Sequence, residues 1–248
     1  MPQRYEHSQG INTFISDSNN YLMSVSQCHS TIVEELNARS NPTRAGQMEA
    51  YLRHKFPFFG IMSQERSALL KQFRSNGLDE LSSLDKRKLV KILWEEPHRE
   101  CQLLALAWMM KWKEKELMAS DLLFFEELIT AKSWWDTVDG IAPNLIGKYA
   151  LKYPEHVQAT WKEWESHESF WIRRSCLIFQ LRYKQQTDLD LLQHFIGKFK
   201  HEKEFFIQKA IGWSLREVSK WNPTWTAEIV RSENLIGLAR REALKYVP

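Results

Sequence analysis

The chain of 248 residues is poor in the residues that make tight turns and cross-links. Its 9 Gly and 8 Pro are too few for the many turns of a multi-stranded sheet, and they favour long helices joined by short loops. Its three cysteines, Cys28, Cys101 and Cys176, are odd in number and widely spaced. This pattern argues against a disulfide framework and a thiolate zinc site, and it favours a reducing, cytoplasmic location.

Segments that enter a membrane and several common catalytic motifs are also missing. The longest apolar run, residues 103–110, is far shorter than the roughly 20 residues that span a bilayer. The start of the chain lacks the apolar core of a signal peptide. No His-Glu-x-x-His, glycine-rich phosphate loop or hydrolase nucleophile elbow occurs. We therefore expect no membrane contact, no metal and no cofactor.

What the chain does have is tryptophan, with 11 residues, and an uneven charge. Most large aromatic side chains pack in cores, but some stack on ligands. Residues 1–130 carry 16 basic and 17 acidic side chains, a net charge of −1, whereas residues 131–248 carry 18 and 14, a net charge of +4. The overall charge of +3 is too weak to indicate a nucleic-acid partner, but the surplus lies in the second half.

Helical signals cover most of the chain. Residues 1–28 are rich in Ser, Asn and Gln without a sustained period, so we expect a flexible N-terminal extension there and one domain over residues 29–248. Beyond them, caps and prolines divide the chain into amphipathic segments, and no segment has the pattern of a strand longer than about five residues. The sequence predicts an all-α protein.

Two predicted helices have specific start signals. Asn41 followed by Pro42 supplies a cap and a first-turn proline, which predicts a helix through about Lys55. Ser133 and Asp136 have the spacing of a capping box, which predicts a helix that starts there and runs toward Pro143, with Tyr153 as the alternative end.

A repeat is visible in the second half of the chain. A large apolar residue precedes a basic residue by three positions in Trp171–Arg174, Phe206–Lys209 and Leu238–Arg241, at separations of 35 and 32 residues, and Trp134 lies 37 residues before Trp171. A period in the thirties with two helices per unit is typical of a helical solenoid. Either Arg174, Lys209 and Arg241 form a basic row on the concave side, suited to a phosphate backbone, or they are solvated helix positions.

One segment, Lys132–Gly140, departs from this background. Asp139 has no capping role, and it lies four residues after Trp135, which would place a carboxylate beside an indole on one helical face. Trp213 follows two repeats later, and Tyr51 lies in an earlier helix. From spacing alone, packing in the core is the favoured role for all three aromatic residues.

Four separated segments together resemble the AlkD-type DNA alkylation repair glycosylases: Tyr51–Ile61, Lys132–Asp139, Leu177–Lys184 and Glu204–Glu217. The resemblance extends over about residues 30–247. It implies HEAT-like helical repeats that form a solenoid with a basic concave groove for duplex DNA. It also implies an enzyme that removes cationic N3- and N7-alkylated purines from double-stranded DNA in base excision repair. We expect a monomer, since a solenoid that wraps around DNA needs no second copy.

The resemblance also implies roles for individual residues. Asp139 matches the catalytic carboxylate, and Trp135 and Trp213 match an aromatic pair that lies against the deoxyribose of the lesion. The residues that it implies to contact DNA are Arg174, which grips the backbone, Tyr51, and Arg182, which stands in place of a lysine. Lys209 and Arg241 join them as members of the predicted basic row.

The chemistry agrees with these residue types. Alkylation at N3 or N7 makes the base a cationic leaving group, and its departure leaves an oxocarbenium-like sugar. A carboxylate about 4 Å from that cation, at an effective dielectric constant of about 20, interacts by about 4 kcal/mol, which corresponds to roughly a thousandfold in rate. Many enzymes that act on bases flip them out of the duplex. The resemblance implies that here the lesion stays stacked.

Two other functions are consistent with the same sequence. One is a non-catalytic relative that binds distorted or branched DNA through the same groove, although such a protein has no need of Asp139 between two indoles. The other is a HEAT-type scaffold for protein partners, which has no need of a basic row.

Overall fold

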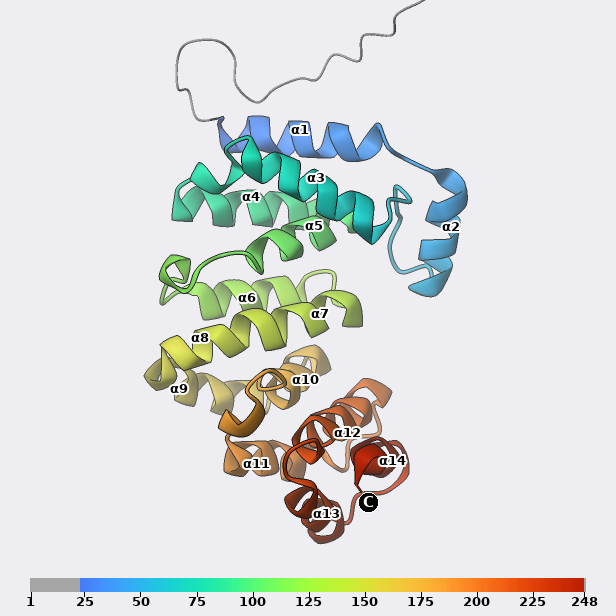
Figure 1. Cartoon of the computed structure of the whole chain (residues 1–248), viewed down its shortest axis with the longest axis vertical. Helices are drawn as coiled ribbons and strands as arrows, with labels where there is room; N and C mark the ends of the chain where they lie inside the picture. The colour runs from blue at the N-terminus through green and yellow to red at the C-terminus, as the bar shows by residue number, and fades with distance from the viewer. Residues whose placement is uncertain (1–22, 248) are drawn as a thin grey trace, which may run out of the picture. The chain divides into compact units, whose positions relative to one another are not determined.

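The computed structural model describes residues 23–247, and every regular element in that range is helical (Figure 1). The all-α prediction is therefore confirmed. Residues 1–22 of the predicted extension lie outside the described residues. Helix α1 (Val25–Asn37) begins at Val25, where Ser24 and Gln27 form a reciprocal capping box, so residues 25–28 belong to the first helix.

The described chain divides into two compact units between Ala105 and Leu106. In the N-terminal unit α1 packs on α4, and the core is formed by apolar side chains such as Leu36, Phe73 and Leu93. The further elements of this unit are α2 (Pro42–Tyr51), α3 (Ser63–Ser75), the 3-10 turn η1 (Leu78–Glu80), α4 (Ser83–Glu95) and the first part of α5 (Arg99–Met109).

Helix α2 is shorter than the sequence predicts. Its start is as expected, because the Asn41 side chain accepts the Arg44 N–H and Pro42 occupies the first turn. It ends at Tyr51 and not near Lys55, because Arg53 and His54 adopt left-handed backbone angles, with φ of 56° and 53°. The predicted C-terminal boundary was therefore wrong.

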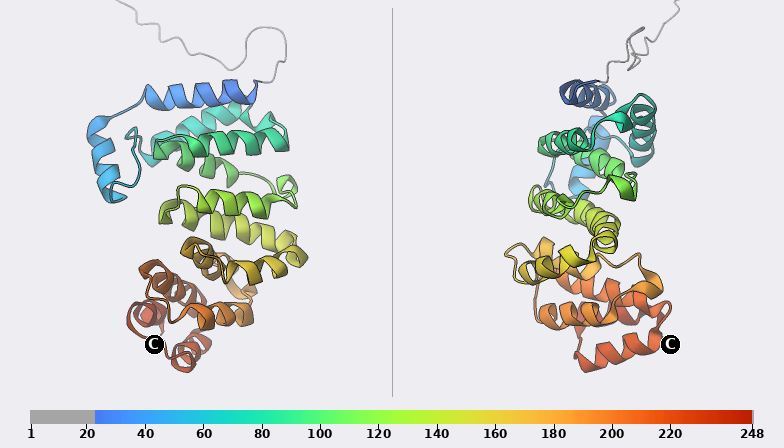
Figure 2. Two further views of the ribbon diagram at one scale, coloured as in Figure 1. Left: turned by 180° about the vertical axis from the view of Figure 1, so that it is seen from behind. Right: turned by 90° about the vertical axis from the view of Figure 1, so that its left-hand side faces the viewer.

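The C-terminal unit is built of helix pairs. Pairs α9/α10, α11/α12 and α13/α14 begin at Pro154, Leu189 and Pro223, which are 35 and 34 residues apart, and the second helices pack on one another in the order α10, α12, α14 (Figure 2). This confirms the predicted HEAT-like pairing. The elements are η2 (Glu114–Glu116), α6 (Asp121–Thr130), α7 (Trp135–Ile141), η3 (Ala142–Ile146), α8 (Gly147–Lys152), α9 (Pro154–Trp164), α10 (Phe170–Ile178), η4 (Lys184–Gln186), α11 (Leu189–Phe199), α12 (Phe205–Ser219), α13 (Pro223–Ser232), α14 (Gly237–Ala243) and η5 (Leu244–Tyr246).

The start of α7 differs from its prediction. The Ser133 hydroxyl donates to the carbonyl oxygens of Ile129 and Thr130, at 2.6 and 3.0 Å, so it caps the end of α6. Trp134 occupies the N-cap position of α7 without a side-chain cap, and the predicted capping box does not form. The alternative end near Tyr153 is confirmed, because α7 continues through the π-helical segment η3 into α8, a widening that accommodates the missing N–H of Pro143.

Within the described range, no helix has the length and apolar character needed to cross a membrane. The same residues bring no three His, Cys, Asp or Glu side chains together in an arrangement that could hold a metal ion. The three cysteines are unpaired and buried, and burial raises the pKa of the Cys176 thiol.

Two glycines of the N-terminal unit provide a matched test of its packing. Gly60 has φ of +89°, and a Cβ there would lie 2.2 Å from the Asn41 carbonyl oxygen. Gly46, inside α2, has nothing within 4 Å of such a Cβ. We expect Gly60→Ala to lower the free energy of unfolding by about 2–4 kcal/mol and Gly46→Ala to raise it by about 0.5–1 kcal/mol. Urea unfolding followed by circular dichroism measures both, and equal effects of the two substitutions would contradict this packing.

Candidate functional site

Asp139 and Arg174 form a bidentate ion pair in the C-terminal unit. Nε of Arg174 donates to Oδ1 of Asp139 and Nη2 donates to Oδ2, both at 2.8 Å. The Arg174 side chain is 1% exposed, whereas that of Asp139 is 20% exposed. The pair thus has a buried cationic end on α10 and a carboxylate on α7 that solvent reaches.

The remaining nitrogen of the Arg174 guanidinium extends the pair to a third helix. Nη1 donates to the carbonyl oxygen of Phe206, in the first turn of α12. With all three nitrogens engaged and almost no exposed surface, the guanidinium is not presented to a phosphate in this conformation. The structure therefore places Arg174, which the sequence assigned to the DNA backbone, behind Asp139 as the residue that orients its carboxylate.

The pair occupies equivalent positions of neighbouring repeats. Asp139, Arg174, Lys209 and Arg241 are each the fifth residue of their helices, α7, α10, α12 and α14. Three basic residues and one acidic residue therefore share the same helix position in successive repeats, and the acidic residue is the first of the four. The spacing of 35 residues between Asp139 and Arg174 equals that between Arg174 and Lys209, and this signal could have revealed the pair from sequence.

An aromatic cluster packs the starts of the same three helices together. The Trp134 ring lies 5.8 Å from the Trp171 ring and 5.5 Å from the Phe206 ring, and the last two are 4.8 Å apart, measured between centroids. Each such contact contributes about 0.5–1.5 kcal/mol beyond the buried area. The cluster holds α7, α10 and α12 at the separation that the Asp139–Arg174–Phe206 contacts require, and it explains the 37-residue spacing of Trp134 and Trp171.

The two candidate indoles lie on helices of this site. Trp135 is the first residue of α7, one turn before Asp139, and is half-buried. Trp213 is half-buried on α12, one turn after Lys209. Close packing and an ion pair join α12 to α14 on both sides of Trp213: a Cβ on Gly212 would lie 2.5 Å from Cβ of Glu242, and Arg216 pairs with Glu242.

The other predicted site residues have exposed side chains. Lys209 and Arg241 are exposed members of the register on α12 and α14. Arg182 is exposed beyond the C-terminal end of α10, whereas Arg174 lies in the middle of that helix. Tyr51, 72% exposed, is the last residue of α2 in the N-terminal unit. Among the eight predicted residues, Asp139 and Arg174 are joined by direct hydrogen bonds.

The arrangement suits stabilisation of a positive charge outside the pair. A carboxylate that is held on both oxygens by one buried guanidinium cannot rotate freely, so its exposed edge has a fixed direction. Fixed dipoles and charges stabilise a developing charge without reorganising.

Comparisons with known proteins agree with the all-helical fold. A family model described as DNA alkylation repair enzyme matches residues 32–247. A solved structure described as a predicted DNA alkylation repair enzyme from Enterococcus faecalis is similar with a TM-score of 0.77 and 33% identity, over 84% of this chain and 96% of that chain. No protein with a curated description matches the chain.

The buried pair makes Asp139 a determinant of stability. Removing its carboxylate leaves the Arg174 charge buried without compensation, so we expect Asp139→Ala to lower the free energy of unfolding by about 3–5 kcal/mol. Asp190→Ala, at an exposed position in the first turn of α11, is the control and should cost about 1 kcal/mol or less. Equal losses in urea unfolding of the two variants would show that the pair does not hold the site together.

Proposed function

The chain belongs to the family of DNA alkylation repair enzymes, and from this membership we propose that it is a DNA glycosylase. In this proposal it hydrolyses the N-glycosidic bond of cationic N3- and N7-alkylated purines in duplex DNA, and so acts in base excision repair. The observation that carries the proposal is the partly exposed carboxylate of Asp139, held by a buried arginine within a family that repairs alkylated DNA.

Asp139 is the proposed catalytic group. Because an alkylated purine already carries a positive charge, its departure needs little acid, and the barrier lies in forming the sugar cation. The carboxylate would stabilise that cation and direct the attacking water. Arg174 acts through Asp139: its two donors fix both carboxylate oxygens at 2.8 Å, which defines the direction in which the exposed edge faces.

Trp135 and Trp213 are the proposed walls of the site. Indole faces attract a cation by about 0.5–2 kcal/mol, depending on desolvation, and they exclude water from one side of the sugar. The half-burial of both side chains supports this role, since a half-buried indole is anchored in the protein and still has surface for a ligand. Binding of the sugar between them needs no pocket for a flipped base, and so we propose that the lesion remains stacked.

Exposed basic side chains supply the proposed affinity for DNA. Lys209 and Arg241 continue the register of the site along α12 and α14, so their charges lie on successive repeats. Contacts of this kind with phosphates bind duplex DNA without reading its sequence. Tyr51 and Arg182 are further proposed contacts, and a cytoplasmic monomer without a cofactor would suffice for all of these steps.

Base release tests the proposal directly. We expect the wild-type protein to release 7-methylguanine from methylated duplex DNA in single-turnover reactions, and Asp139→Asn to slow this release by roughly a thousandfold because the neutral amide stabilises the sugar cation far less. Asp136→Asn, which neutralises the neighbouring acid on α7, is the control and should change the rate by less than about tenfold.

Two results would contradict the mechanism. Absence of release by the wild-type protein, with DNA binding intact, would favour a non-catalytic DNA-binding protein. Release by Asp139→Asn at the wild-type rate would remove Asp139 from the reaction.

A further inference from the structure

A buried carboxylate in the N-terminal unit holds the segment that follows α2. Glu100 is fully buried at the start of α5, and its two oxygens accept three consecutive backbone N–H groups. Phe59 donates to Oε2 at 3.0 Å, and Gly60 and Ile61 donate to Oε1 at 2.8 and 3.0 Å. A buried acid is costly unless such charge-assisted bonds compensate it. These three bonds therefore fix the backbone of residues 59–61 against the start of α5.

Further contacts hold the same segment on the start of α5. The Phe59 ring stacks on His98 with centroids 3.8 Å apart, and the Arg99 guanidinium lies 3.9 Å from the centroid of the Phe56 ring. The Arg99 N–H donates to the carbonyl of Pro57 at 2.9 Å. The chain from Phe56 to Ile61 is thus fixed from both its backbone and its side chains.

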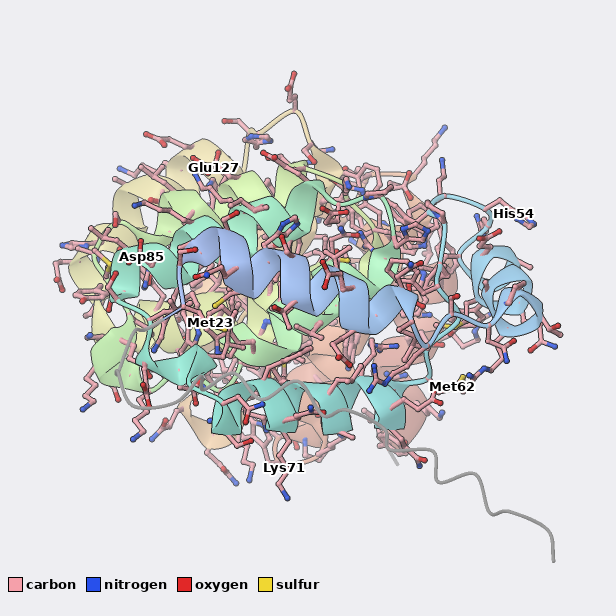
Figure 3. The ribbon with its side chains drawn as sticks, turned by 90° about the horizontal axis from the view of Figure 1, so that it is seen from above. Met23, His54, Met62, Lys71, Asp85 and Glu127 are labelled. Atoms are coloured by element: carbon pink, nitrogen blue, oxygen red, sulfur yellow. The ribbon has the colours of Figure 1, made fainter. Side chains whose placement is uncertain are left out.

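An exposed basic turn, residues 53–55, joins α2 to this fixed segment, and its backbone N–H groups donate to the carbonyls of Ala50, Glu49 and Leu52. Arg53 and His54 have left-handed backbone angles, which Gly or Asn adopts at lower cost, and Lys55 follows them. All three side chains are exposed, and His54 points outward beside α2 in Figure 3. The carboxylate of Glu49, the acid of α2, accepts the Phe58 N–H at 3.2 Å.

We propose that this α2 basic turn, residues 53–55, is a binding site for backbone phosphates of duplex DNA, and that Glu100 is its positioning residue. The ligand class rests on the proposed function. A turn that is already ordered loses little entropy on binding, and strained non-glycine residues concentrate at sites where their side chains are used. The neighbouring Tyr51 side chain, 72% exposed, adds a ring that can lie against the sugars of the same strand.

Salt dependence of binding tests the turn. Each phosphate contact of a Lys or Arg contributes about 0.9 to the slope of log K against log salt. We expect Arg53→Ala/Lys55→Ala to reduce this slope by about 1.8 and the affinity for an undamaged duplex, measured by fluorescence anisotropy, by on the order of 50-fold at ~0.1 M salt.

A variant with the same charge change is the control. Lys71 and Lys88 are exposed on α3 and α4 of the same unit, and Lys71 lies on a different side of it from His54 (Figure 3). We expect Lys71→Ala/Lys88→Ala to leave both slope and affinity within about twofold of wild type. An unchanged slope in the turn variant, or an equal loss in the control, would overturn the proposed site.

Glu100→Gln tests the positioning role, because the amide keeps the shape of the side chain and loses the charge that orders the three N–H groups. We expect it to lower the salt slope while far-UV circular dichroism is retained, and to cause no further loss when added to the turn variant. An additional loss would assign Glu100 to general stability only. Base release by the wild-type protein is read separately, so a failure of the glycosylase proposal and a failure of this site are distinguishable.

Discussion

The bidentate pair of Asp139 and Arg174 is the interaction on which the candidate site depends. A guanidinium that is 1% exposed must satisfy its nitrogens inside the protein, and it does so with both oxygens of one carboxylate and one backbone carbonyl of α12. Three helices are thereby linked through one side chain. The carboxylate consequently has one orientation, and its direction is set by the repeat packing and not by a mobile loop.

The repeat architecture explains how this pair arises. The second helices of the pairs pack in register, so the fifth residues of α7 and α10 become neighbours. A basic residue at every such position would give a uniformly basic row. Asp139 at the first position instead provides a carboxylate that can stabilise a cation. The cluster of Trp134, Trp171 and Phe206 makes the helix starts rigid enough to hold it.

Features that depend on local sequence were predictable, and features that depend on packing were not. The Asn41 cap with Pro42 in the first turn of α2 follows from residue type, and the period of the repeats follows from spacing. Both predictions are confirmed. The predicted capping of α7 by Ser133 was wrong. The Ser133 hydroxyl could bond either to the start of α7 or to the end of α6, and only the path of the chain after α6 decides between them. Burial of Arg174 was also hidden, because an arginine at a solvated spacing and one beneath a carboxylate look alike in sequence. The resemblance located Asp139, but not the residue that orients it.

The most direct test of this account is a double-mutant cycle on the rate of 7-methylguanine release, with Asp139→Asn, Arg174→Lys and the two combined, measured at saturating protein. Lysine keeps the positive charge but cannot hold both carboxylate oxygens. If Arg174 acts through Asp139, Arg174→Lys slows release in the wild-type background and has no further effect once Asp139 is replaced. Multiplying losses in the combined variant would show that Arg174 contacts the DNA independently, and would contradict the central place given to the pair.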